Sequence, residues 1–476
     1  MADVIKFGTD GWRAVIAEDY TFANVRICAQ SVANYLHDTG KADKGFVVGY
    51  DTRFSSEHFA AAVAEVLAGN GIVAHLCDRS TPTPVISYSI LVQEAAGAAI
   101  ITASHNPAIW NGFKYKPEYA GSASPEVVAE LEKRIASIQA GEIEVKRMPL
   151  ARAVDEGLIR YLDPAPAYLQ HIGDLVDLKR LQHTGLTVAV DSMYGAGAGY
   201  FQRLLEGGTT RVLGLHQERN PLFPGLERPE PIDENLHPLE RFVPQQRATV
   251  GLATDGDADR IGAVDENGRY INQLWMYGLL ALYLLEVKKW RGPLIKSLTT
   301  TSMAEALGKV YGVPVYETAV GFKYIGPKML EVDAILGGEE SGGFGFRSHI
   351  PERDGLLSGL FLLDMVTQLG RSPSQLVDYL FEKVGPHYYD RNDYTFPAEQ
   401  RQEIVNRIER ARPASVDGAK VVDVVTIDGY KYMLADGSWL LIRFSGTEPV
   451  IRIYTETDSP DRVKRILAEG KRMAGL

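Results

Sequence analysis

"GFVVGYDTRFSSEHFAAAVAEVLAGNGIVAHLC", residues 45–77, contains the pattern on which the fold depends. It begins with an apolar strand and a polar turn, continues with a helix whose apolar residues recur at helical spacing, and ends with a glycine and a second strand. The hydrophobic period therefore changes from about 2 residues to about 3.6 and back. This order is that of a βαβ unit, so the stretch predicts parallel strands in a mixed α/β domain.

The same order occurs twice more along the chain. The second copy runs from "LTVAVDSMYGAGAG" through "YFQRLLEGG" to "RVLGL", and the third from "GPLIKSLTTT" through "SMAEALGKVYG" to "VPVYET". Three copies predict three similar α/β domains. The chain after residue 388 differs, because it reads as a helix, several strands and a final helix, which is an α+β layout.

Composition and charge restrict the possible partners and compartment. The chain has 476 residues, 45% of them hydrophobic and 23% charged, which is ordinary for a folded protein of several domains. The net charge of −11, without a basic stripe, predicts no nucleic-acid partner. No apolar run reaches membrane-spanning length and no signal peptide is evident, so we expect a cytoplasmic protein. Cys28 and Cys77 are expected to be buried thiols.

The loop "DGDADR" at residues 255–260 carries three alternate carboxylates. Asp255, Asp257 and Asp259 are separated by a glycine and an alanine, so the side chains can converge on one hard cation. An acidic turn exposed to solvent is the weaker interpretation, because three crowded like charges need a compensating cation. The loop therefore predicts a magnesium site.

Two further loops carry groups suited to phosphate. In "ITASHNPAIWNGFK", residues 101–114, Ser104 follows an apolar strand and precedes His105; taken alone, this serine would be interpreted as a helix cap. "RFSGTEPVIRIY", residues 443–454, offers arginines, hydroxyls and backbone amides to a phosphate dianion, or it is a structural hairpin. Beside a metal loop, the pair favours phosphoryl transfer over acyl transfer, since no G-x-S-x-G elbow surrounds the serine.

Together these loops resemble those of the α-D-phosphohexomutase superfamily. The phosphoserine loop "TASHNP", the metal loop "DGDxDR", the sugar loop "GEESG" and the phosphate loop "SGTEP" occur in that order, with "FGTDGWR" near the start and "VGFKYI" before the sugar loop. The resemblance spans nearly the whole chain. It implies four domains around a central cleft, in which three similar mixed α/β domains precede a smaller α+β C-terminal domain: 1–164 (phosphoserine), 165–268 (metal), 269–387 (sugar) and 388–476 (phosphate).

The resemblance also implies roles for individual residues. Ser104 is the phosphorylated serine, and one Mg²⁺ per chain is held by Ser104, Asp255, Asp257 and Asp259. The residues implied near the reacting phosphoryl group are Arg13, His105, Lys114 and Arg260. Lys323 faces the sugar or its phosphate, and Glu339 and Ser341 bind sugar hydroxyls. The distal phosphate is bound by Arg443, Ser445, Gly446, Thr447 and Arg452.

The reaction implied is that of a phosphoglucomutase, an isomerase that interconverts glucose 1-phosphate and glucose 6-phosphate through glucose 1,6-bisphosphate, which also serves as activator. Many phosphomannomutase-type members have histidine where this chain has Gly343, and the continuation into "ERDG" is closer to phosphoglucomutases. Phosphomannomutase and phosphoglucosamine mutase remain alternatives within the family. Outside it, the alternatives are a metal-dependent sugar-phosphate phosphatase and a non-catalytic sugar-phosphate sensor. The expected partners are hexose phosphates, and the expected assembly is a monomer or homodimer.

Overall fold

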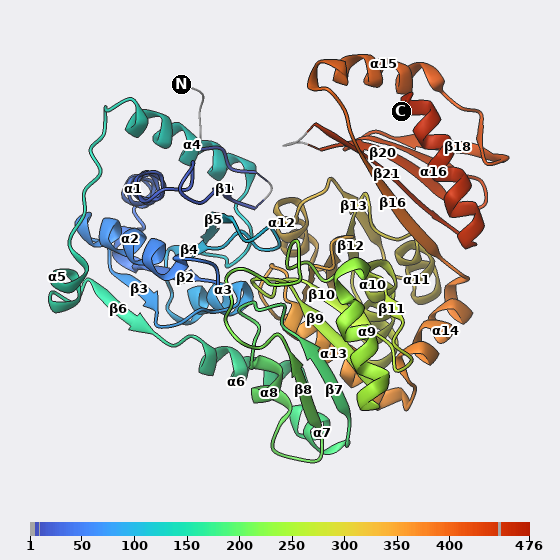
Figure 1. The fold of residues 1–476 in the computed structure, drawn as a ribbon, viewed down its shortest axis with the longest axis horizontal. Helices are drawn as coiled ribbons and strands as arrows, with labels where there is room; N and C mark the ends of the chain where they lie inside the picture. Colours follow the sequence, from blue (N-terminus) through green and yellow to red (C-terminus); the bar gives the residue numbers. More distant parts are fainter. Residues whose placement is uncertain (1–4, 9, 446–448) are drawn as a thin grey trace.

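Four β-sheets organise the chain (Figure 1). The computed structural model describes residues 5–8, 10–445 and 449–476. The first domain, in blue, lies at one side of the view, and the C-terminal domain, in red, lies at the opposite upper side (Figure 1). Among the described residues, no helix is both long and apolar enough to cross a membrane.

The first domain contains the βαβ unit at residues 45–77. Its elements are β1 (Trp12–Val15), α1 (Phe22–Asp38), the 3₁₀ turn η1 (Ala42–Lys44), β2 (Phe46–Tyr50), α2 (Ser56–Gly69), β3 (Ala74–Cys77), α3 (Thr83–Val92), β4 (Gly97–Ile101), β5 (Trp110–Pro117), α4 (Pro125–Gln139), α5 (Leu150–Asp155) and β6 (Ile159–Leu162). The sheet order is β1-β5-β4-β2-β3-β6, with β4, β2, β3 and β6 parallel. Every residue of β2 and β4 is buried, as expected for parallel strands covered by helices on both faces.

The second domain repeats this arrangement with five strands. Its elements are α6 (Ala165–Leu175), α7 (Leu178–His183), β7 (Thr187–Asp191), α8 (Tyr200–Leu205), β8 (Arg211–Leu215), α9 (Asp233–Gln246), β9 (Val250–Thr254), β10 (Ile261–Val264) and β11 (Tyr270–Ile271). The sheet order is β11-β10-β9-β7-β8, with β9, β7 and β8 parallel. Because β11 pairs with β10, this sheet extends beyond residue 268.

The third domain has the smallest of the three α/β sheets. Its elements are α10 (Gln273–Leu282), the π-helical turn η2 (Tyr283–Val287), β12 (Leu294–Ser297), α11 (Met303–Tyr311), β13 (Val315–Thr318), α12 (Phe322–Val332), β14 (Leu336–Gly338), β15 (Phe344–Phe346), α13 (Gly355–Leu369) and α14 (Pro373–Val384). The sheet order is β13-β12-β14-β15, with the first three parallel. Asp354 begins α13, because its side chain accepts a hydrogen bond from the Leu357 amide at 2.9 Å.

The C-terminal domain is built on an antiparallel sheet. Its elements are β16 (Tyr388–Thr395), the 3₁₀ turn η3 (Ala398–Gln400), α15 (Arg401–Ala411), β17 (Ser415–Val416), β18 (Ala419–Val425), β19 (Tyr430–Leu434), β20 (Trp439–Phe444), β21 (Val450–Thr457) and α16 (Pro460–Ala474). The strands follow the order β16-β21-β20-β19-β18-β17. The predicted fold class, three mixed α/β domains followed by a smaller α+β domain, is confirmed.

The hydrophobic clusters do not all follow the domain boundaries. The first and fourth domains each have a core of their own. The second and third domains share one, in which Leu252 of β9 and Leu280 of α10 belong to the same cluster as Leu357 of α13. Cys28 and Cys77 are buried free thiols, as predicted.

One connection recurs in all three α/β domains. A central parallel strand ends, a polar loop follows, and an antiparallel strand returns along it: β4 to β5, β9 to β10, and β14 to β15. The loops at these connections are residues 102–109, 255–260 and 339–343. They contain Ser104, the three aspartates and Glu339.

Candidate active site

Ser104 is buried, and its backbone is in the left-handed region with φ of 52°. Its amide donates to Thr102 Oγ1 at 2.8 Å, and its carbonyl accepts from Arg53 Nη2 at 2.7 Å. The interpretation of Ser104 as a helix cap is wrong, because a turn and then β5 follow it. Its hydroxyl donates to Asp255 Oδ2 at 2.8 Å, so it points at the metal loop of the second domain.

Arg53 maintains the shape of the Ser104 loop. Besides the Ser104 carbonyl, its guanidinium donates to the carbonyls of Asn106, Pro107 and Trp110 at 2.6 to 3.0 Å. The side chain is fully buried and pairs with Asp51. A single arginine more than 50 positions from the loop leaves no local pattern in the sequence, so sequence reasoning missed its role.

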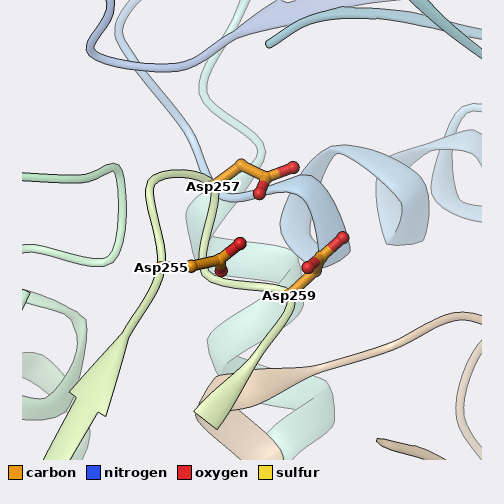
Figure 2. A group of neighbouring side chains, drawn as sticks. All are labelled: Asp255, Asp257 and Asp259. Carbon is orange, nitrogen blue, oxygen red and sulfur yellow. The ribbon is translucent and has the colours of Figure 1, made fainter. Parts of the chain in front are cut away.

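The aspartates of the metal loop converge, as Figure 2 shows. Asp255, Asp257 and Asp259 are buried and each offers a carboxylate oxygen within 4.8 Å of the others. The Oδ1 atoms of Asp257 and Asp259 are buried without a hydrogen-bond partner. Buried unpaired carboxylate oxygens are costly, whereas a hard cation such as Mg²⁺ prefers oxygen ligands. The residues present therefore fit a divalent cation.

The second oxygen of two of these aspartates is held by the protein. Asp257 Oδ2 accepts from Lys114 Nζ at 2.8 Å and from Thr83 Oγ1 at 2.6 Å. Asp259 Oδ2 accepts from Lys114 Nζ at 3.2 Å and pairs with Arg353 at 2.8 Å. These contacts fix each carboxylate and leave its Oδ1 available.

The three carboxylates differ in their electrostatics. Burial, followed by the charges of Asp259 and Asp257, raises the pKa of Asp255 well above its usual range. Burial also acts to raise the pKa of Asp257, but the contacts with Lys114 and Thr83 outweigh it and the pKa lies below its usual value. Asp257 is consequently ionised at neutral pH.

Glycines allow the loops to approach one another. A Cβ on Gly256 would lie 2.5 Å from the Ser104 carbonyl oxygen, and one on Gly195 would lie 2.7 Å from the Asp255 carbonyl oxygen. The glycine-rich turn that contains Gly195 therefore packs directly behind the metal loop, and the Ala196 amide donates to the Gly256 carbonyl at 2.9 Å.

Asp10 binds a cluster of buried cations beside the metal loop. Its carboxylate contacts Lys114 at 2.8 Å, Lys116 at 2.8 Å and Arg353 at 2.6 Å. Lys116 also pairs with the buried Glu352. Sequence reasoning finds only Lys114 among these residues, although Asp10 lies in "FGTDGWR" and Arg353 in "ERDG", and those motifs were the available signal.

His105 lies next to the serine hydroxyl, with Nδ1 3.3 Å from Ser104 Oγ. Burial lowers the pKa of His105 well below its usual value, and the nearby charges of Arg260 and Arg13 lower it further. The imidazole is therefore neutral at pH 7.

Arg13 and Arg260 add positive charge around the same loop. Arg13 Nη1 donates to Asn106 Oδ1 at 2.6 Å, and Arg260 Nη1 donates to Glu230 Oε1 at 2.7 Å. The structure thus gathers Ser104, its neighbours and the metal loop in one cluster.

The sugar loop reaches this cluster through Arg353. Glu339 is buried, and its Oε2 lies 3.7 Å from Arg353 Nη1. Ser341 is half-buried in the same loop, and Lys323, also half-buried, lies in α12 with its ammonium over the Tyr324 ring. Glu340 is directed to the C-terminal domain instead, where it accepts from Tyr389 at 2.7 Å.

The predicted phosphate loop belongs to the C-terminal sheet. Arg443 of β20 and Arg452 of β21 are opposite each other in the antiparallel register. Arg443 pairs with Asp428 at 2.9 Å and Arg452 with Asp393 at 3.3 Å. Ser445 is buried, whereas Gly446 and Thr447 lie outside the described residues.

Comparison with protein families agrees with this geometry. Four phosphoglucomutase/phosphomannomutase domain models match the chain: alpha/beta/alpha domain I over residues 4–142, domain II over 166–268, domain III over 275–384 and the C-terminal domain over 403–471. The chain belongs to the phosphoglucomutase/phosphomannomutase family. The predicted membership of the α-D-phosphohexomutase superfamily is confirmed, and the protein is a phosphohexomutase, an enzyme of the isomerase class.

Several relatives in this family extend over the full length of the chain. A "Phosphoglucomutase/phosphomannomutase" of Thermococcus kodakarensis is 31% identical over 98% of this chain and 97% of its own length. A "Probable phosphoglucosamine mutase" of Methanothermobacter thermautotrophicus is 32% identical over 97% of this chain and 95% of its own. The crystal structure of a "putative phosphomannomutase" from Thermus thermophilus superposes over 100% of both chains with a TM-score of 0.86 and 34% identity.

Proposed function

We propose that this phosphohexomutase interconverts the 1-phosphates and 6-phosphates of glucose and mannose through phosphorylated Ser104. The observation that carries the proposal is the buried Ser104 hydroxyl, which donates to Asp255 at 2.8 Å within a cation-binding triad. Such a site supplies positioning and neutralisation of charge, which are the main requirements of phosphoryl transfer.

The reaction consists of two successive phosphoryl transfers, the first from Ser104 to the sugar and the second from the sugar back to Ser104. First, the P–O bond at Ser104 breaks and a P–O bond forms to the free 1- or 6-hydroxyl of the hexose monophosphate; the proton of that hydroxyl ends on Ser104 Oγ, and the product is a 1,6-bisphosphate. After the bisphosphate has turned over, its other phosphoryl group returns to Ser104. In this second transfer the hydroxyl proton of Ser104 passes to an adjacent acceptor, Asp255 Oδ2 or His105 Nδ1, and the sugar oxygen that loses its phosphoryl group takes up a proton in exchange.

Charge on the transferred group is neutralised from several directions. Asp255, Asp257 and Asp259, together with the phosphate on Ser104, would hold Mg²⁺, which would supply positive charge to the transferring phosphoryl group. Lys114 and Arg13 contribute fixed positive charge at the same place. His105, neutral at pH 7, adds no positive charge.

Both orientations of the intermediate require the same distal site. We assign this site to Arg443, Ser445, Gly446, Thr447 and Arg452. Arg443 and Arg452 lie directly opposite each other on neighbouring strands, and each is held by one carboxylate, so two guanidinium groups stand side by side where they can bind one phosphate dianion. A phosphatase needs no such site, which argues against that alternative, and a non-catalytic sensor needs no serine beside three aspartates.

The sugar loop supports the choice of sugars. We assign Glu339 and Ser341 to the 3- and 4-hydroxyls of the sugar. These hydroxyls lie near the axis about which the bisphosphate turns between its two orientations, so the same residues can bind them in both. The 2-position, where glucose and mannose differ, is then read weakly. The names of the relatives favour the phosphomannomutase or phosphoglucosamine mutase alternatives over a phosphoglucomutase in particular, and one name combines glucose with mannose.

Phosphoglucosamine mutase is the second candidate. It is favoured by the name of a 32% identical relative, and glucosamine also differs from glucose at the 2-position alone.

The test is a substrate panel. Purified protein with Mg²⁺ and hexose 1,6-bisphosphate is assayed on the 1-phosphates of glucose, mannose and glucosamine, and both the 6-phosphate and inorganic phosphate are quantified. We expect 6-phosphates from glucose and mannose at comparable kcat/KM. Glucosamine as the only converted sugar would establish the second candidate, and release of inorganic phosphate as the only product would contradict both.

A further inference from the structure

Arg353 lies between the metal loop and the sugar loop and is not among the residues assigned to the reaction above. It precedes the cap of α13, and its side chain is buried. Its guanidinium contacts four carboxylates: Asp10 at 2.6 Å, Asp259 at 2.8 Å, Glu352 at 3.2 Å and Glu339 at 3.7 Å. One side chain therefore links three domains.

The chain leaves room for this side chain at Gly343. A Cβ on Gly343 would lie 2.3 Å from Arg353 Cδ and 2.8 Å from its Cγ. The backbone at Gly343 has no positive φ, so its conformation does not require glycine. Glycine is required there because a larger side chain would collide with Arg353. The side chain of Arg353 thus fills the position that any residue larger than glycine would require.

Two of the four carboxylates that Arg353 contacts belong to different binding sites: Asp259 to the cation site and Glu339 to the sugar site. Its Nη2 contacts Asp259 Oδ2, the oxygen that Lys114 also binds, so that Oδ1 stays unpaired and available to a cation. Its Nη1 faces Glu339 Oε2. Burial raises the pKa of Glu339, and the guanidinium opposes this effect and favours the ionised carboxylate that accepts sugar hydroxyls.

We propose that Arg353 is a positioning residue that links cation binding to sugar binding, by holding Asp259 with one oxygen free and directing the carboxylate of Glu339. This inference rests on the proposed function for the identity of the sugar. Arginine is required because its planar fork presents separate donors to the two carboxylates, whereas a lysine ammonium is a single point of charge.

The test uses Arg353→Lys, which keeps a positive charge among these buried carboxylates and so avoids the destabilisation that follows when one partner of a buried ion pair is removed. Two affinities are measured without turnover: that for Mn²⁺, by electron paramagnetic resonance, and that for glucose 1-phosphate in the presence of Mn²⁺, by calorimetry. We expect both to weaken by roughly tenfold, the effect of losing one charge-assisted contact. In the Glu339→Gln background, Arg353→Lys should weaken glucose 1-phosphate binding by much less than tenfold, because the partner is already altered.

Two further variants keep the result interpretable. Gly343→Ala displaces Arg353 without removing it and should reproduce both losses. Arg347→Lys, in the same loop but paired with Asp333 at 3.0 Å, is the matched control and should change neither affinity. Thermal unfolding of each variant identifies any that is misfolded.

An Mn²⁺ affinity that is unchanged in Arg353→Lys and Gly343→Ala overturns the inference. The inference is also overturned if Arg353→Lys weakens glucose 1-phosphate binding as strongly in the Glu339→Gln background as it does in the wild-type protein. Because both readouts are binding measurements, they remain decisive even if the substrate panel shows no mutase turnover, a result that would refute the proposed function alone.

Discussion

The two carboxylate oxygens of Asp257, in the metal loop, have different partners. Lys114 and Thr83 bind its Oδ2, and its Oδ1 is buried without a partner. Asp257→Asn keeps the size of the side chain but removes the charge. We expect Mg²⁺ affinity to fall by roughly ten- to a hundredfold and kcat to fall at least as far, while KM for the sugar phosphate changes little. Calorimetry with Mg²⁺ and steady-state kinetics measure these quantities.

The matched control is Asp265→Asn. Asp265 is a buried aspartate of the next turn, and its Oδ1 accepts from the amides of Asn267 and Arg269. This variant should lose some stability and retain its affinity for Mg²⁺. Full activity of the wild-type protein after exhaustive chelation would contradict the assignment of the triad.

Single residues were predictable where the chemistry is local in sequence. Alternate aspartates and a serine at a strand end can be recognised without a structure, and the family motifs then suggest partners such as Lys114. Arg53 could not be recognised in this way, and the "ERDG" motif that contains Arg353 does not show which residues its side chain contacts. Arg353 and its partner Asp10 are 343 positions apart, and only the packing of three domains brings them together.

At the scale of elements, the paired strands β20 and β21 carry the two arginines that we assign to the distal phosphate. Arg452 is held at 3.3 Å from Asp393 and faces Arg443 across the strands. Arg452→Ala should raise KM for the hexose monophosphate by roughly ten- to a hundredfold, the equivalent of one charge-assisted contact. Turnover should also depend more strongly on added bisphosphate, because the intermediate escapes before it turns over. Initial rates at several bisphosphate concentrations measure both effects.

Arg462→Ala provides the comparison within the same domain. Arg462 pairs with Asp417 and Asp436 and is not assigned to phosphate. It should lower the thermal stability of the protein and leave KM and the bisphosphate requirement as they are. If Arg452→Ala behaves in the same way, the loop is a structural hairpin, the alternative interpretation of "RFSGTEP".

The helices and strands themselves were largely predictable. The change of hydrophobic period located the βαβ copies, and later strands of the tail lie where they were predicted, for example β21 over "VIRIYTET". The tail was predicted to begin with a helix, but the strand β16 precedes that helix, and its largely polar sequence "YYDRNDYT" shows no apolar alternation. The glycine-rich turn at Gly195 shows nothing in the sequence beyond a tight connection between a strand and a helix. Its contact with the metal loop depends on a tertiary approach that the local sequence does not encode.

At the scale of the whole molecule, Glu456 joins the C-terminal domain to the third domain. From β21 it accepts hydrogen bonds from the Ser302 amide at 2.7 Å and from the hydroxyls of Ser302 and Thr301, and His387 lies at 3.6 Å. Burial acts to raise the pKa of Glu456, but His387 and the hydroxyls outweigh it and bring the pKa to about 2. The ionised carboxylate therefore stabilises this interface at neutral pH.

Glu456→Gln should lower the stability of the interface by roughly 3 kcal/mol at pH 7, since each pKa unit corresponds to about 1.4 kcal/mol. A depressed carboxylate pKa gives stability that is present above about pH 4.5 and is lost as the pH falls toward 2. Thermal unfolding between pH 7 and pH 3 should therefore show a difference between wild type and Glu456→Gln that narrows with acidification. A difference that stays constant to pH 3 would show that Glu456 does not titrate as described.

The overall architecture was predictable, and the cooperation between domains was not. Three repeats and a different tail indicate the four sheets. The shared core of the second and third domains depends on α13, which begins in the third domain and contributes Leu357 to a cluster that includes Leu252 of β9. Amphipathic patterns show which residues are buried, but they do not show against which domain.

The transfer of phosphate from Ser104 to the sugar is the central claim, and a labelling experiment tests it most directly. The protein is incubated with ³²P-labelled glucose 1,6-bisphosphate, the labelled peptide is located by mass spectrometry, and unlabelled glucose 1-phosphate is then added. We predict that the label resides on Ser104, leaves it for the sugar on the chase, and is absent from Ser104→Ala. Label on another residue, or label released from Ser104 only as inorganic phosphate, would contradict the account.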